Sequence, residues 1–166
     1  MFLKLQLQLS QLIFNDITAD KLEGSLTIHR NDSEMGGDIS LYLTALSNGE
    51  FIIDTLSLHS FGDDKKIQNV LDITADSLNV HFAADVMPDS VITIQLLNLY
   101  TEYGSLLLET EHPDARILIS KDSYTIENLD FKNGDGKINI AGILFPEGMQ
   151  DLSVKIENLA LKQFPD

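Results

Sequence analysis

The sequence predicts an all-β protein, an extended curved antiparallel sheet of stacked hairpins, and its pattern fits either an open trough or a closed sandwich. Apolar and polar residues alternate with a period of two in many parts of the 166-residue chain, as they do in strands with one buried face. Clusters of Gly, Asn, Asp and Pro separate these runs. Because clear helical patterns are missing between the runs, successive strands are expected to pair in antiparallel fashion.

The alternating runs recur along the whole chain. Residues between the apolar positions are mostly Thr, Ser, Gln, Asn and Lys, which a water-facing sheet surface accommodates. Each run therefore predicts a strand with one apolar and one polar face. The apolar positions, in order, are Leu3, Leu5, Leu7 and Leu9; Ile39, Leu41, Leu43 and Ala45; Leu78, Val80, Phe82 and Ala84; Ile92, Ile94 and Leu96; Ile138 and Ile140; and Val154 and Ile156.

Turn signals lie between these strands. Asn-Gly and Asp-Gly pairs supply the positive φ angles that tight hairpins need. Two segments leave a short helix open as an alternative, because apolar residues fall at helical spacing in 63–71 and on more than one face in 96–103. The turn signals lie at residues 31–32 with 36–37, and at 47–49, 61–64, 88–89, 112–114 and 133–136.

The two ends of the chain also have strand character. Residues 3–9 alternate strictly and lack the continuous apolar run of a secretory signal. We expect Met1 to be an added start residue, with the native chain and its targeting signal extending upstream. Residues 161–166 predict a last strand that ends at Pro165. The whole of 1–166 is thus interpreted as a single β-repeat segment of a larger protein.

Two short sequence motifs each occur twice in the chain. Residues 126–129 and 156–159 both read Ile-Glu-Asn-Leu, and residues 16–20 and 72–76 both read Asp-Ile-Thr-Ala-Asp. In both Ile-Glu-Asn-Leu copies the apolar phase slips by one residue, and 75–78 makes the same step. Because such a slip would turn apolar side chains to the wrong face, we expect a β-bulge at each place. Repeated bulges would curve the sheet.

Composition excludes several functions. The net charge of −15 opposes binding to nucleic acid and to anionic lipid headgroups. The chain has no Cys, so disulfides, thiolate metal sites and a Cys nucleophile are excluded. No apolar run reaches the length of about 20 residues that a membrane-spanning helix needs.

No motif predicts an enzyme, a metal site or a cofactor. Residues 131–142 overlap a calcium-loop pattern, but Phe131 and Gly142 stand at two ligand positions, so a hairpin turn is the simpler interpretation. The four His residues are scattered singly, and no pair of carboxylates is singled out for glycoside hydrolysis. A nucleophile elbow and a phosphate-binding glycine loop are both missing.

The C-terminal third carries a family resemblance. Residues 117–119, 124–131 and 133–142 form an apolar hairpin with an Asn-Gly-Asp-Gly turn that closes on Gly142. Residues 147–161 follow with a Gly-x-x-Asp-Leu strand, and 22–28 contains Leu-x-Gly-x-Leu. These features resemble the repeating unit of TamB proteins and the wider AsmA-like superfamily. The resemblance is carried by residues 117–161 and extends to the rest of the chain only in pattern.

This resemblance implies a β-taco fold and an envelope function. Proteins of this family bridge the inner and outer membranes of Gram-negative bacteria, and they are implicated in phospholipid transport and outer-membrane protein assembly. The full-length protein would then be periplasmic and anchored at the inner membrane. Its partners would be phospholipid acyl chains, neighbouring repeats of the same chain and, through regions outside these residues, an Omp85-type outer-membrane barrel.

The apolar faces supply the candidate binding residues. Acyl chains avoid water at about 0.8 kcal/mol per CH₂ group, so a trough of aliphatic side chains would shield them without specific contacts. Two other functions stay open on the sequence: a closed β-sandwich that binds or adheres, and a carbohydrate-active jelly-roll enzyme. The candidate groove residues are Leu5, Leu7, Leu41, Leu43, Val80, Phe82, Ile92, Ile94, Ile138, Ile140, Val154 and Ile156.

Overall fold

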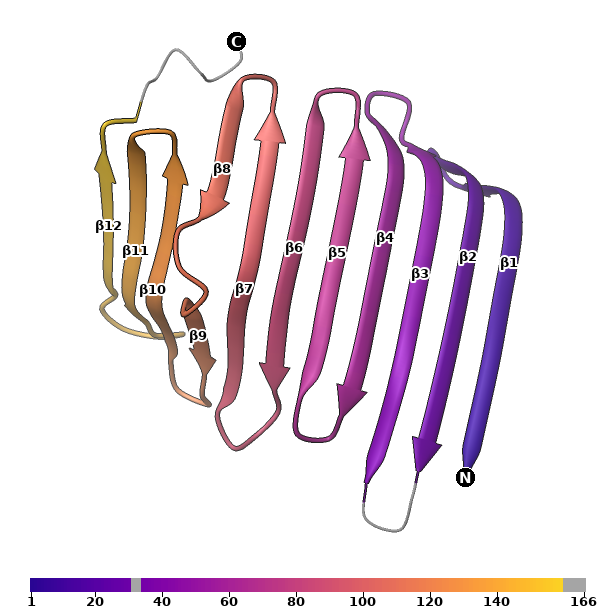
Figure 1. Cartoon of the computed structure of the whole chain (residues 1–166), viewed down its shortest axis with the longest axis horizontal. Coiled ribbons are helices and arrows are strands. Elements are labelled where there is room, and N and C mark those ends of the chain that lie inside the picture. Colours follow the sequence, from indigo (N-terminus) through magenta and orange to yellow (C-terminus); the bar gives the residue numbers. More distant parts are fainter. Residues whose placement is uncertain (31–33, 160–166) are drawn as a thin grey trace.

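The protein is a single antiparallel β-sheet of twelve strands (Figure 1). The computed structural model describes residues 1–30 and 34–159. Strands follow one another across the sheet in chain order, except that β8 and β9 share one position between β7 and β10. The strands are β1 (Phe2–Phe14), β2 (Ile17–Arg30), β3 (Met35–Ser47), β4 (Ile52–Asp63), β5 (Ile67–Ala75), β6 (Leu78–Met87), β7 (Ile92–Tyr103), β8 (Leu106–Thr110), β9 (Arg116–Ile119), β10 (Tyr124–Asn133), β11 (Gly136–Leu144) and β12 (Asp151–Glu157).

The sheet forms one layer. Every extensive contact between the described strands joins neighbours within the sheet. The prediction of an all-β sheet of stacked hairpins is confirmed. The closed sandwich is not the architecture of the described residues, because two facing sheets would bring strands distant in the sheet order into contact.

Local turn chemistry explains why the chain reverses where it does. Three two-residue hairpin loops begin with a residue of positive φ, namely Asn15 at 53°, Gly104 at 59° and Gly134 at 56°. This conformation matches the right-handed twist of the flanking strands. The Asn133–Gly136 segment is one of these hairpins, with Asn133 paired to Gly136. In another turn, the Asp63 carboxylate accepts hydrogen bonds from the backbone N–H groups of Lys65 and Lys66.

Neither of the two possible helices forms, and the described residues contain no helix. Residues 63–66 are the end of β4 and a turn, and residues 67–71 begin β5. Val70, whose spacing from Ile67 suggested a helix, lies opposite His59 and Ala83 on the polar side of the sheet. Residues 96–103 lie within β7, where the pairing with β6 shifts by one residue next to Ala84.

The expected bulges are present in part. The pairing of β10 with β11 shifts between Ile126 and Leu129, and Asn128 has a φ of 53°, so this bulge prediction is confirmed. Asn158 has a φ of 51° but follows the end of β12. The step at 75–78 is a hairpin turn between β5 and β6, not a bulge, so that prediction is wrong.

The two copies of each repeated motif do not occupy equivalent positions in the sheet. The Asp-Ile-Thr-Ala-Asp copy at 16–20 opens β2, whereas the copy at 72–76 closes β5. Ile126 lies opposite Gly142, while Ile156 lies opposite Ile138, so the two Ile-Glu-Asn-Leu copies are displaced along the strands. The turn expected at 31–32 and the strand expected at 161–166 lie outside the described residues.

The best-packed part of the molecule surrounds the break between β8 and β9. Ala115, in the loop that separates them, is fully buried, and its carbonyl accepts a hydrogen bond from the backbone N–H of Leu96 at 2.9 Å. Leu96, Ala115 and Phe131 form a small core, with Phe82, Leu99, Leu108, Leu129, Ile138 and Ile140 packed around it. No large side chain among the described residues is completely buried, as expected for one layer.

Candidate functional site

The candidate site is the apolar face of the sheet, built row by row from cross-strand pairs. Directly opposed residues of antiparallel strands point to the same face, so the register determines each row. One row runs Leu7, Gly24, Leu41, Leu58, Leu71, Phe82 and Leu99 from β1 to β7. The next row runs Leu9, Leu22, Leu43, Leu56, Ile73 and Val80 from β1 to β6. We call this surface the apolar face and the opposite surface the polar face.

The register places all twelve candidate groove residues on the apolar face. Leu5 and Leu7 lie on β1, Leu41 and Leu43 on β3, and Val80 and Phe82 on β6. On the C-terminal side, Ile94 is opposite Ile117, and Ile117 is opposite Ile126. Through these pairs the apolar face continues to Ile92 of β7, Ile138 and Ile140 of β11, and Val154 and Ile156 of β12. The twelve residues thus share one broad surface but do not converge on one enclosed pocket.

Much of the apolar face is open to solvent. Leu5 is 54% exposed, Leu7 51%, Val154 54% and Ile156 58%, while the strands between them are half-buried by their neighbours. No described segment forms a second layer over this face. Single exposed apolar residues are ordinary on protein surfaces, but a contiguous apolar surface marks a place where something binds.

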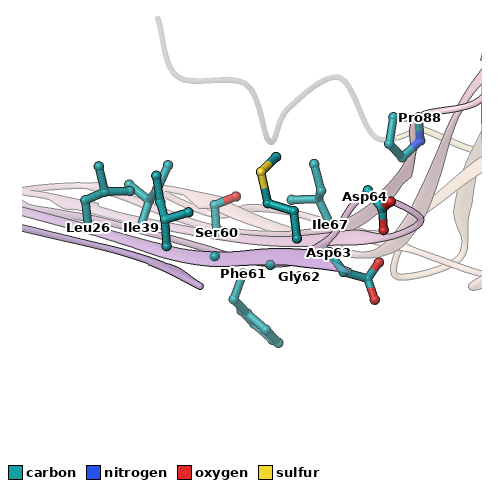
Figure 2. Close-up of a pocket in the computed structure, with 13 residues that line it drawn as sticks. Leu26, Ile39, Ser60, Phe61, Gly62, Asp63, Asp64, Ile67 and Pro88 are labelled. Carbon is teal, nitrogen blue, oxygen red and sulfur yellow. The ribbon is translucent and has the colours of Figure 1, made fainter. Parts of the chain in front are cut away.

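Glycines hollow the apolar face near one end of β2 to β5. One cross-strand row here runs from Ile28 of β2 through Gly37 and Gly62 to Ile67 of β5. Gly37 and Gly62 are therefore directly opposed. Two neighbouring residues without side chains leave a gap, and a depression of about 310 Å³ lies there. Leu26, Ile39 and Ile67 project into it, whereas the Phe61 side chain projects to the opposite side (Figure 2).

The depression was not predicted from the sequence. It is lined by none of the twelve candidate residues but by Leu26, Ile28, Met35, Ile39, Ile67 and Pro88, among others. The sequence did contain a signal in Gly37 and Gly62. The interpretation of residues 36–37 and 61–62 as parts of turns is wrong, because they lie inside β3 and β4, with Gly37 and Gly62 at apolar positions. Beyond Ile67 the ribbons rise on the side to which Leu26 and Ile39 project, so the sheet bends toward its apolar face (Figure 2).

The polar face carries close pairs of ionisable side chains from neighbouring parts of the sheet. His59 Nε2 lies 2.6 Å from Asp38 Oδ2, and His81 Nδ1 lies 2.6 Å from Asp72 Oδ1. Lys66 Nζ lies 2.6 Å from Asp85 Oδ2, and the Asp85 side chain is nearly buried. Such pairs join adjacent strands and keep this surface hydrated. They add little stability where both partners are exposed.

Hydrogen bonds to charged side chains shift several pKa values on this face. A hydrogen bond from Lys137 holds the pKa of Glu111 below its ordinary value, and the same contact raises the pKa of Lys137. The hydrogen bond from Tyr100 to Glu102 raises the pKa of the Tyr100 phenol, because its proton is held by the carboxylate. None of these groups faces the apolar surface, so they maintain the polar exterior.

Other kinds of site lack support in the geometry. Among residues 1–30 and 34–159, no cluster of three or more His, Asp or Glu side chains has the arrangement to hold a metal ion. The same residues include no helix with the length and apolar character needed to cross a membrane. Comparison with protein-family models, with curated proteins and with solved structures finds no match to this chain.

Proposed function

We propose that this chain is a segment of an envelope protein that shields lipid acyl chains from water on its apolar face. The observation that carries the proposal is the continuous apolar face that extends from β1 to β12 and that no described segment covers. A folded protein gains nothing by leaving aliphatic rows in water, since each buried CH₂ group is worth about 0.8 kcal/mol. A ligand that is itself apolar and extended would remove this cost.

The shape of the face favours acyl chains over compact ligands. Its side chains are mainly Leu, Ile, Val and Phe, with Ser60 and Asn69 as polar exceptions, and the two rows described above carry no charged group. The depression at Gly37 and Gly62 is open and lined mainly by aliphatic side chains, which suits the end of a flexible hydrocarbon chain. The acidic polar face would keep the carrier dissolved and away from anionic bilayer surfaces.

The cellular setting of this proposal rests on the resemblance to TamB and AsmA-like proteins. The full-length protein would be periplasmic and anchored at the inner membrane, would move phospholipid toward the outer membrane and would assist outer-membrane protein assembly. Further repeats of the same chain would extend the sheet beyond β12, and regions outside these residues would engage an Omp85-type barrel. The segment itself would act as a non-enzymatic conduit without a cofactor.

Lipid binding can be tested with one pair of variants on β3. Leu41→Asp places a charge in the centre of the apolar face, whereas Thr44→Asp places the same charge on the polar face, opposite Lys21. We expect purified protein to bind a fluorescent phospholipid, with the Leu41 variant weakened at least tenfold and the Thr44 variant unchanged. Native mass spectrometry should find phospholipid on the wild-type protein.

Folding of each variant is checked by circular dichroism. A folded Leu41 variant that binds as tightly as the wild type would contradict the proposal, as would a wild-type protein that binds no phospholipid. If Leu41→Asp fails to fold, Leu5→Asp on the exposed edge strand replaces it, because Leu5 is already 54% exposed.

A further inference from the structure

The depression ends at a border that carries a guanidinium group. Arg30 of β2 is directly opposed to Met35 of β3, two residues beyond the pair of Ile28 and Gly37. Every second residue of a strand points to the same side, so Arg30 and Met35 lie on the same side of the sheet as the apolar face. Met35 lines the depression, and the exposed Arg30 lies beside it. The positive charge of Arg30 is therefore at the end of the depression where β2 ends.

A carboxylate lies at the same border, on the other side of Met35. Asp64 follows the last residue of β4 and lines the depression. Its side chain lies on the side of the sheet to which Leu26 and Ile39 project (Figure 2). Only β3 separates β2 from β4, so the backbones of Arg30 and Asp64 are about two strand spacings, or roughly 10 Å, apart. The apolar depression thus ends between two opposite charges.

In the described part of the chain, neither Arg30 nor Asp64 has a charged partner. The neighbouring Asp63 carboxylate accepts hydrogen bonds from backbone N–H groups of its own turn. The two lysines near the border form other pairs: Lys65 Nζ lies 3.7 Å from Glu34 Oε1, and Lys66 Nζ lies 2.6 Å from Asp85 Oδ2. The charges of Arg30 and Asp64 are therefore available to a ligand.

We propose that the depression and its border bind a zwitterionic phospholipid, with the phosphate at Arg30, the ammonium group at Asp64 and the first part of an acyl chain in the depression. Arginine binds phosphate oxygens through two parallel hydrogen bonds, and a carboxylate attracts an ammonium group. The acyl chain would continue over Ile39 toward Leu41, while the head group stays hydrated at the end of the strands. This inference rests on the proposed function and adds the class of lipid and its orientation.

Charge complementarity favours a zwitterionic head group over an anionic one. A phosphatidylglycerol head group offers a phosphate to Arg30 but only uncharged hydroxyl groups to Asp64. The net charge of −15 also repels an anionic lipid. Because the Arg30 and Asp64 side chains are exposed, water weakens both contacts, and the expected discrimination between head groups is a few-fold.

Two fluorescent lipids with identical labelled acyl chains, phosphatidylethanolamine and phosphatidylglycerol, test the head-group contacts. We expect the wild-type protein to bind phosphatidylethanolamine about threefold to fivefold more tightly, which is the range of an exposed ion pair. Asp64→Asn should remove this preference. Asp122→Asn makes the same change of charge in the turn between β9 and β10 and should keep it. Arg30→Gln should weaken the binding of both lipids about equally, because both carry a phosphate.

Filling the depression tests the position of the acyl chain. In Gly37→Val the added Cβ meets the backbone oxygen of Thr27 at 3.1 Å, and the rest of the side chain occupies the depression. Gly24→Val adds the same side chain to the apolar face outside the depression, where the nearest atoms lie 3.8 Å or more from the Cβ. We expect Gly37→Val to weaken phosphatidylethanolamine binding about tenfold, as the loss of roughly two buried CH₂ groups predicts, and Gly24→Val to leave it unchanged.

Circular dichroism checks folding, and Gly37→Ala replaces Gly37→Val if the latter does not fold. Equal affinity of the wild type for the two lipids would overturn the head-group assignment and leave the proposed function intact. The same loss of preference in the Asp64 and Asp122 variants would overturn it too, as would a folded Gly37 variant that binds as tightly as the wild type. A wild-type protein that binds neither lipid would contradict the proposed function itself, and this inference with it.

Discussion

Replacing Gly142 with alanine tests whether the close approach of β11 and β12 depends on a residue without a side chain. Gly142 has a φ of 138°, a region that only glycine occupies readily. A Cβ atom built on it would lie 2.0 Å from the backbone oxygen of Asp151, in the neighbouring strand β12. Gly62 has the same relation to Lys66, with a φ of 155° and a Cβ-to-oxygen distance of 2.0 Å.

Two destabilising effects add in Gly142→Ala. An ordinary Cβ contact is 3.4 Å or longer, so the backbone of β12 has to move by more than 1 Å and loses part of its pairing with β11. The backbone conformation alone costs an L-residue about 1–3 kcal/mol. We expect the free energy of unfolding to fall by about 3 kcal/mol. Gly104→Ala is the matched control, because Gly104 has a φ of 59° and no atom within 4 Å of the added Cβ, so about 1 kcal/mol is expected.

Urea denaturation followed by far-ultraviolet circular dichroism measures both variants. With a slope of about 2 kcal/mol per molar urea, the midpoint of Gly142→Ala should lie about 1 M below that of Gly104→Ala. Gly62→Ala should resemble Gly142→Ala. Equal midpoints for the Gly142 and Gly104 variants would refute the reasoning, because they would mean that close approach of the strands at Gly142 is not needed.

Two further predictions concern packing and charge. Phe131→Ala removes a side chain that is 9% exposed in the small core and should lower the free energy of unfolding by about 3–5 kcal/mol, whereas Ile156→Ala, at 58% exposure, should cost less than about 1 kcal/mol by the same urea assay. Because its pKa is lowered in the folded protein, Glu111 contributes stability above its ordinary pKa of 4.5, and this contribution is lost as the pH falls through the folded pKa. In Lys137→Gln the Glu111 pKa, followed by NMR of the side-chain carboxyl, should return toward 4.5; an unchanged pKa would exclude Lys137 as the cause.

Local alternation predicted the apolar faces of β1, β3, β6, β7, β11 and β12, the strands that contain the runs, but it marked no run in β4 or β5. In β1 the leucines at 3, 5, 7 and 9 could face one side only if the chain is extended, and β6 follows the same rule. Where a bulge interrupts the alternation in β7, the pattern left open a short helix that does not form. In β7 the shift next to Ala84 puts Leu96 and Leu99 on the same face, three residues apart, which imitates the spacing of a helix.

The candidate site was harder to predict because it depends on long-range geometry. An open sheet and a closed sandwich both need one apolar and one polar face, so residues such as Leu41 and Ile140 look alike in either. The depression arises where Gly37 and Gly62 meet across two strands. That meeting is a matter of register, which single-strand patterns leave undetermined.

The single layer also changes how the molecule responds to change in chain length. Since each strand is held mainly by the two beside it, the free energy of the whole is close to a sum of neighbour terms, as in solenoid proteins. A hairpin gained or lost then alters stability only near the place of insertion, provided that its alternation stays in phase. Such an architecture can be lengthened or shortened by whole hairpins while the distant strands keep their packing.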